Sequence, residues 1–214
     1  MSFLKLYQRA LPCRDRISRM KDIRYIVGID EAGRGPLAGP VSVGVICIPI
    51  KFPRQFFKGI KDSKALSSHQ REEWFKKIKA QKKLGLVYTV SFRTAGRIDK
   101  KGIIVSIKEC IQSALIRLNI SPKHSLILLD GGLKAPSEFR FQKTIIRGDV
   151  KKPVIALASI VAKVLRDRKM IRYAKLYPKY FFDIHKGYGT KLHRKLIKKH
   201  GPSFLHRKSF LKIV

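Results

Sequence analysis

The chain contains very few acidic residues. Of its 214 residues, 14 are Asp or Glu and 48 are Lys or Arg, which gives a formal net charge of +34 at pH 7. A field of this sign attracts polyanions, because each phosphate that a protein neutralises releases a condensed counterion. Nucleic acid is therefore the first partner to consider, and an anionic membrane surface is its rival.

Long apolar runs and paired cysteines are also missing. The longest apolar stretch, 43–50, is far shorter than the roughly 20 residues that a membrane span needs. The three cysteines are widely spaced and form no CxxC pair, which argues against a disulfide framework and against a zinc site. The amino-terminal stretch lacks the apolar segment of a secretory signal. We expect a cytoplasmic protein without a membrane segment, with a short basic arm over residues 1–24.

The remaining composition is that of a folded domain with both strands and helices. With 44% hydrophobic residues, the chain can bury one good core. Runs rich in β-branched residues predict strands over 25–30, 41–48, 84–92, 125–130 and 141–149. Apolar residues at helical spacing predict helices over 69–82, 101–118 and 152–176. The first two strands are expected to form a hairpin. The order of elements predicts an α/β protein with a mixed β-sheet flanked by helices.

The sequence before the helix over 69–82 contains a capping signal. Ser67 or Ser68 is the expected N-cap of that helix, with Glu72 and Glu73 in its first turn.

Residues 184–214 contain no acid but many Lys and Arg, with interleaved His, Tyr and Phe. We predict that this basic segment binds substrate and belongs to the same domain as a core over 25–183. A solvated basic face is the alternative.

Because acids are scarce, their positions carry information. Asp30 and Glu31 end the run "YIVGI", Asp130 ends "LILL", and Asp149 follows "TIIRG". Three predicted strands thus end in acid, and open α/β sheets form ligand sites at the carboxyl ends of strands. Each acid also has a structural interpretation, as a turn residue, a cap or an ion-pair partner of a local arginine.

Converging carboxylates predict a metal site. Carboxylates that lie together repel one another, and a divalent cation relieves this repulsion. Hard oxygen ligands select Mg²⁺ or Mn²⁺ over softer metals. Two such ions would activate water and stabilise the leaving oxygen of a phosphodiester. This chemistry is accessible to a strongly basic protein.

The loop after the first acid pair, "GRGPLAG", suggests contact with a ribose. Its spacing is GxGxxxG with Pro36 in the middle and a strand after it, which does not fit a dinucleotide-binding loop. Gly33 and Gly35 allow the backbone to approach a bound nucleic acid closely. Since the 2′-hydroxyl distinguishes RNA from DNA, this loop could recognise that group.

Seven motifs, in this order, resemble the ribonuclease HII family: "GIDEAGRGPLAGPV", "DSKAL", "LLDGG", "RGD", "ASIVAKVLRDR", "HKGYGT" and "HGPSFLHRKSF". The resemblance runs from about Tyr25 to Phe210. It implies a ribonuclease H-like fold, with a basic helical segment at the carboxyl terminus. It also implies a monomeric, divalent-metal-dependent endonuclease. The implied substrates are the RNA strand of RNA/DNA hybrids and single ribonucleotides in duplex DNA. Cleavage on the 5′ side of the ribonucleotide would leave a 3′-hydroxyl and a 5′-phosphate.

The resemblance also assigns roles to single residues. Asp30, Glu31, Asp130 and Asp149 would bind the metal ions and carry the catalysis. Gly33, Arg34 and Gly35 would contact the ribose 2′-hydroxyl and the adjacent phosphate. Tyr188 would stack on the deoxyribose after the ribonucleotide, and Lys64 would contact phosphate. Ser159 and Lys163 would shape or support the site.

Several alternatives remain open in the sequence. Asp167 competes for the role of fourth carboxylate, but Lys163, four residues earlier, offers it an ordinary helix ion pair, which we prefer. Tyr188 could cover the core, and Arg34 could pair with a neighbouring acid. The four histidines from 185 onward form no zinc-like pattern with cysteine, and we assign them no metal role.

Other functions also remain open. A non-catalytic nucleic-acid-binding protein would also explain the charge. A relative that cleaves only DNA is disfavoured by the Gly-Arg-Gly loop.

Overall fold

One mixed β-sheet forms the centre of the protein. The computed structural model describes residues 22–60 and 66–211, and within them five strands pair in the order β3-β2-β1-β4-β5. The strands are β1 (Tyr25–Ala32), β2 (Val41–Pro49), β3 (Val87–Arg93), β4 (Ser125–Asp130) and β5 (Gln142–Ile145). Strands β1, β2 and β3 pair antiparallel, whereas β4 is parallel to both β1 and β5. The predicted hairpin and the predicted mixed α/β sheet are confirmed.

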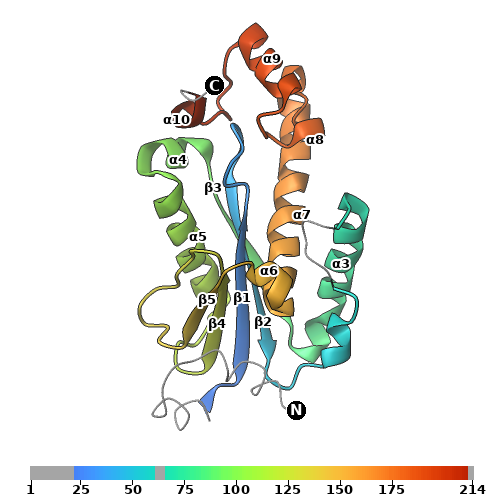
Figure 1. The fold of residues 1–214 in the computed structure, drawn as a ribbon, viewed down its shortest axis with the longest axis vertical. Helices are drawn as coiled ribbons and strands as arrows, with labels where there is room; N and C mark the ends of the chain where they lie inside the picture. Colours follow the sequence, from blue (N-terminus) through green and yellow to red (C-terminus); the bar gives the residue numbers. More distant parts are fainter. Residues whose placement is uncertain (1–21, 61–65, 212–214) are drawn as a thin grey trace.

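Helices cover both faces of the sheet (Figure 1). Helices α4 (Ala95–Lys101) and α5 (Ile103–Arg117) lie on one face, and α3 (Ser68–Ala80) and α7 (Pro153–Leu176) lie on the other. Strand β1 contributes side chains to the hydrophobic clusters on both faces of the sheet, because alternate side chains of a strand point to opposite faces. Ile26 joins the core cluster beneath α7, and Val27 and Ile29 join the cluster beneath α5. Asp30 follows the same alternation and faces α7.

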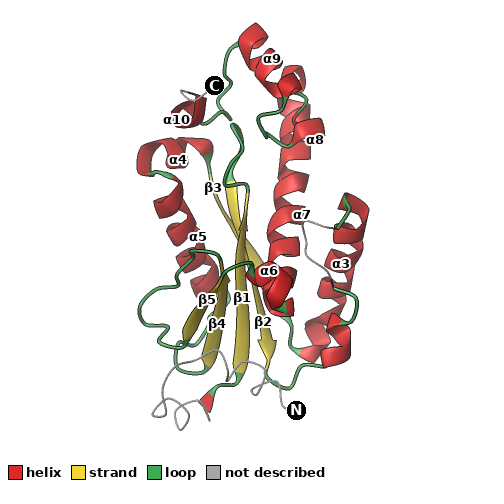
Figure 2. Ribbon diagram, in the orientation of Figure 1, coloured by secondary structure: helices red, strands yellow, loops and turns green. Residues whose placement is uncertain are grey.

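The carboxyl-terminal segment continues the fold beyond one end of the sheet. Helices α8 (Phe182–His185), α9 (Lys191–His200) and α10 (Lys208–Leu211) lie there, as can be followed in Figure 2. The backbone of Ala38, in the loop after β1, pairs with His206 in an isolated bridge. Most of the predicted amino-terminal arm, 1–24, lies outside the described residues, and the boundary at 183 stays a prediction. Within the described ranges, no helix has the length and apolar character required to cross a membrane.

The predicted strand over 141–149 is wrong in its second half. Strand β5 ends at Ile145, and Arg147 adopts a left-handed conformation with φ of 55°. A left-handed residue turns the chain out of a strand. Asp149 therefore lies in the first turn of the short helix α6 (Gly148–Lys151) and not at a strand end. The chain turns back at this point, and α6 returns toward the end of β4.

Three other boundaries differ from the sequence prediction. The helix expected over 101–118 starts at Ile103, after Gly102 with φ of 79°, and the separate helix α4 before it was not predicted. The strand expected over 84–92 starts at Val87, because residues 81–84 form a 3-10 turn. Of the two predicted N-caps, Ser67 is the one that caps α3, and it forms a capping box with Gln70 that was not predicted. However, Glu72 and Glu73 lie beyond the first turn.

Helix α7 packs directly on the backbone of the sheet. Its first half is buried all round, from Val154 to Ala162. The approach is close because β1 and β2 carry glycine beneath it. A Cβ atom on Gly28 would lie 2.2 Å from the carbonyl oxygen of Val154, and one on Gly44 would lie 2.2 Å from that of Ala158. This contact holds α7 against the strand that carries Asp30.

Candidate active site

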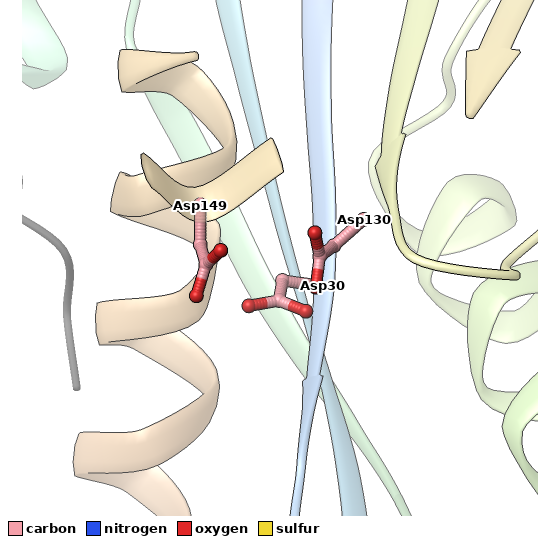
Figure 3. A group of neighbouring side chains, drawn as sticks. All are labelled: Asp30, Asp130 and Asp149. Atoms are coloured by element: carbon pink, nitrogen blue, oxygen red, sulfur yellow. The ribbon is translucent and has the colours of Figure 1, made fainter. Parts of the chain in front are cut away.

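Three carboxylates converge at one end of the sheet. Asp30, Asp130 and Asp149 each offer one oxygen, and these oxygens all lie within 4.8 Å of one another (Figure 3). Asp30 and Asp130 are neighbours across parallel strands, because the register pairs Ile29 with Leu129 just before them. Helix α6 brings Asp149 to the same point.

Backbone amides orient these acids. The amide of Gly148 donates to Oδ1 of Asp130 at 2.6 Å, which links the end of β4 to the start of α6. The amide of Glu31 donates to Oδ1 of Asp30 at 2.8 Å, and the amide of Val150 donates to Oδ1 of Asp149 at 3.1 Å. Asp30 and Asp149 are buried, whereas Asp130 is half-buried. The group is therefore built into the fold.

The electrostatics of the group favour a cation. Burial raises the pKa of Asp30 well above its usual value, and the charges of Glu31 and Asp130 raise it further. Burial also raises the pKa of Glu31, although Arg34 opposes this effect. A positive ion among these oxygens would stabilise their ionised forms. The donor set consists only of carboxylates, and it therefore fits a hard divalent cation such as Mg²⁺ or Mn²⁺.

Glu31, the fourth predicted ligand, lies beside this group and is not one of the three. Its carboxylate is 3.6 Å from Nη1 of Arg34, an ion pair at the mouth of the site. The pairing that the sequence allowed for Arg34 is thus present. Asp167, the rival for the fourth position, accepts a hydrogen bond from Nζ of Lys163 at 2.9 Å, as expected, and also lies outside the group.

A cleft of about 410 Å³ joins Asp30, Glu31 and Asp130, but not Asp149, to other predicted site residues. Its lining includes Asp30, Glu31, Gly33, Arg34, Gly35, Asp130, Ser159, Lys163 and Tyr188. Arg71 of α3 also lines the cleft, and the sequence analysis missed it because nothing in its motif separates it from the other arginines. Lys64 lies outside the described residues. A larger cavity of about 700 Å³ is found at the amino ends of the parallel strands, away from the acid group.

Comparison with known proteins identifies the family. The family model for ribonuclease HII matches residues 27–213. The chain belongs to the ribonuclease HII family. A ribonuclease HII from Bacillus cereus strain B4264 is 42% identical over 195 residues, which are 91% of this chain and 72% of the relative. One from Chlamydia pneumoniae is 43% identical over 190 residues, 89% of this chain and 85% of the relative.

Solved structures agree with this assignment. The ribonuclease HII in a complex with PCNA from Archaeoglobus fulgidus is 26% identical with a TM-score of 0.69, covering 86% of this chain and 93% of that one. A ribonuclease HIII in complex with Mn²⁺ has a TM-score of 0.66 at 15% identity over 91% of this chain and 72% of that one, and shows the shared fold. The predicted ribonuclease H-like fold is confirmed. The chain is an endoribonuclease of a divalent-metal-dependent enzyme class.

Two buried arginines hold the loop that begins with Gly-Arg-Gly and ends at Pro40. Arg207 donates to the carbonyl oxygens of Gly33 at 2.6 Å and Arg34 at 2.8 Å. Arg166 donates to the carbonyl oxygens of Pro40 at 2.9 Å and Lys186 at 3.1 Å. Neither arginine is exposed, and burial lowers the pKa of Arg207 to about 9. Since buried charges need such partners, these bonds fix the path of the loop.

Tyr188 stands at the edge of the same cleft. It is 39% exposed, so it does not serve mainly to cover the core. Nζ of Lys163 lies 5.2 Å from the centre of its ring, and Cζ of Arg166 lies 5.6 Å from it. The ring thus has cationic neighbours on the protein side and an open side toward the cleft.

Three of the four carboxyl-terminal histidines form a buried cluster that the sequence analysis did not predict. His185 and His193 stack with ring centres 4.0 Å apart, and Nε2 of His193 lies 3.1 Å from Nε2 of His206. Burial, together with the neighbouring His185, lowers the pKa of His193 and of His206 to about 4. The three rings pack around Phe182.

The histidine cluster predicts a loss of stability in acid. In the unfolded chain these imidazoles titrate near pH 6.5, so between about pH 6.5 and 4 the unfolded state binds more protons. Their contribution is complete above pH 6.5 and is lost as the pH falls toward 4. Since one pKa unit corresponds to about 1.4 kcal/mol, we expect each ring to lower the free energy of unfolding by on the order of 3 kcal/mol over this range.

Urea unfolding at a series of pH values measures this effect. The control is a variant with His193→Phe and His206→Leu, which keeps every carboxyl group of the natural chain. The difference in unfolding free energy between the two proteins should shrink from pH 7 to pH 4. A constant difference across this range would contradict the prediction.

Proposed function

We propose that this protein is a metal-dependent endonuclease that cleaves the RNA strand of RNA/DNA hybrids and cuts on the 5′ side of single ribonucleotides in duplex DNA. The products would carry a 3′-hydroxyl and a 5′-phosphate. One observation carries the proposal: Asp30 and Asp130 line the same cleft as the Gly-Arg-Gly loop and Tyr188, and Asp149 lies beside them. We further expect a monomer that acts in the cytoplasm.

Asp30, Asp130 and Asp149 would hold Mg²⁺ or Mn²⁺, and Glu31 would complete the ligand set from the adjacent position. When bound, such ions supply a polarised water and stabilise the charge on the leaving oxygen of a phosphodiester. The chain contributes the positions of the acids, through the amides of Gly148 and Glu31. It also contributes the pairing of Glu31 with Arg34, which lies beside the expected path of the substrate.

The Gly-Arg-Gly loop would distinguish ribose from deoxyribose. Arg207 donates hydrogen bonds to the carbonyl oxygens of Gly33 and Arg34, and these bonds keep the loop rigid. A rigid backbone can hold its hydrogen-bonding groups in register with a 2′-hydroxyl, which is both donor and acceptor. The half-exposed Arg34 side chain would contact the adjacent phosphate. Tyr188 would stack on the deoxyribose that follows.

Other basic residues would bind the substrate backbone. Arg71 and Lys163 line the cleft, and Lys64 remains a predicted phosphate contact. The acid-free segment 184–214, which contains Tyr188, would supply further phosphate contacts. Such contacts position a duplex without reading its sequence.

Cleavage of a labelled DNA duplex that contains one ribonucleotide tests this function. The assay includes Mg²⁺ or Mn²⁺, an all-DNA duplex and a long RNA/DNA hybrid. We expect one cut 5′ of the ribonucleotide, cutting of the hybrid, and loss of both with a chelator, because the site depends on a cation. Cutting of the all-DNA duplex would contradict ribose recognition. Binding without any cleavage would favour a non-catalytic nucleic-acid-binding protein.

A further inference from the structure

Two of the three buried histidines, His206 and His193, form a directed chain of hydrogen bonds that ends at Tyr188. The amide of Ser203 donates to Nδ1 of His206 at 2.8 Å, so the proton of this neutral ring is on Nε2. That Nε2–H donates to Nε2 of His193 at 3.1 Å, which leaves the proton of His193 on Nδ1. Nδ1–H of His193 then donates to the carbonyl oxygen of Tyr188 at 2.9 Å. Each ring is neutral, and each nitrogen is satisfied.

The same chain connects the two loops at the cleft. His206 lies in the backbone bridge to Ala38, and the amide of Gly39 donates to the carbonyl oxygen of Leu205 at 2.8 Å. His206 is thus attached to the loop that continues from Gly-Arg-Gly. His193 lies in the first turn of α9, whose N-cap Thr190 accepts from its amide. The two imidazoles therefore add a second link between these loops, beside the direct bonds from the amides of Leu37 and Ala38 to the carbonyl oxygen of Gly187.

We propose that His193 and His206 are positioning residues that hold Tyr188 in the orientation needed to recognise the junction between RNA and DNA. The inference rests on the proposed contact of Tyr188 with substrate. Tyr188 is exposed on the cleft side, and glycines flank it in the chain. Its carbonyl oxygen accepts from the amide of Thr190 at 2.8 Å as well as from His193. Together with the hydrogen bonds to the carbonyl oxygens of Gly187 and Gly189, they fix the backbone on both sides of the Tyr188 ring.

Three substitutions of His193 separate the two hydrogen bonds of the ring. His193→Asn keeps an N–H donor near the position of Nδ1 and loses the bond to His206. His193→Gln keeps a polar group near the position of Nε2 and loses the donor to Tyr188. His193→Phe keeps the ring shape and loses both bonds. If the contact with Tyr188 is what matters, the Asn variant should retain function and the other two should lose it.

The readout is a ratio of two activities. We compare kcat/KM on a duplex with one embedded ribonucleotide with kcat/KM on a long RNA/DNA hybrid, where most cleavage positions lack an RNA-to-DNA junction. We expect His193→Phe and His193→Gln to lower this ratio by about tenfold, and Tyr188→Ala to lower it by about 30-fold, as for a lost stacking contact. His193→Asn should stay within about threefold of the natural protein.

A double-variant cycle tests whether His193 acts through Tyr188. In a Tyr188→Ala background, His193→Phe should change the ratio no further, because the group that it positions is gone. Additive effects of the two changes would overturn the inference. So would an unchanged ratio in His193→Phe, provided that Tyr188→Ala lowers it. If Tyr188→Ala itself leaves the ratio unchanged, the proposed role of Tyr188 fails, and the inference fails with it.

Two controls separate positioning from general stability. Phe182→Leu weakens the packing around the same rings and should lower the melting temperature without changing the ratio. If it lowers the ratio as much as His193→Phe, the inference is overturned. Should His193→Phe not fold, His193→Gln replaces it, since it also lacks the donor to the carbonyl oxygen of Tyr188. Its ratio should also fall, and an unchanged ratio would count against the proposal.

Discussion

Replacement of Asp130 by asparagine is expected to abolish cleavage while leaving the fold and duplex binding intact. Asparagine has the shape of aspartate, and its Oδ1 can still accept the hydrogen bond from the amide of Gly148. It lacks the negative charge that the group of three acids presents to a cation. Since metal ions contribute several kcal/mol to such reactions, we expect kcat to fall by about a thousandfold or more.

The measurement is single-turnover cleavage of the ribonucleotide-containing duplex, alongside duplex binding at several ionic strengths. Binding should persist, because it depends on phosphate contacts and on the salt concentration. Asp22→Asn is the matched control, because Asp22 is exposed and lies near the amino end of β1. Its activity should equal that of the natural protein. Full activity of the Asp130→Asn enzyme would remove Asp130 from the reaction.

The acids of the site could be found from the sequence because the chain has so few of them. Asp30 and Asp130 end apolar runs that are adjacent parallel strands, and the carboxyl ends of such strands meet. Asp149 was predicted to lie at the end of a strand, and this local prediction was wrong. It comes to the site on a short helix after Arg147 turns the chain, and a left-handed arginine has no signal in a single sequence.

The support of the site could not be predicted, because it depends on tertiary contacts. Arg166 and Arg207 are 2 of 48 Lys and Arg residues, and nothing in their motifs shows that these two are buried. The pairing of His193 with His206 likewise requires the bridge between Ala38 and His206, which joins segments far apart in the chain. The resemblance to a family named residues at the cleft surface, with Ser159 and Lys163 as supports, but it did not point to the buried arginines and histidines.

The packing of α7 on the sheet leads to the second large expected effect. Gly44→Ala should destabilise the protein by about 3 kcal/mol or more, as expected when a close-packed contact is overfilled. The added Cβ would lie 2.2 Å from the carbonyl oxygen of Ala158 and 2.8 Å from the amide nitrogen of Ala162. Both neighbours are helix backbone, which cannot move aside as a flexible side chain can. The helix would have to shift away from the sheet.

A shift of α7 would also disturb the candidate active site. Gly44 pairs directly with Asp30 across β1 and β2, and Ser159, next to Ala158, lines the cleft. We therefore expect Gly44→Ala to lower activity at temperatures where the protein is still folded. Urea unfolding gives the stability change, and Gly96→Ala is the matched control. Gly96 lies within helix α4 with no atom near its Cβ position, so alanine there should stabilise by up to about 1 kcal/mol. Equal stability of the two variants would mean that α7 is not held against the strands by this contact.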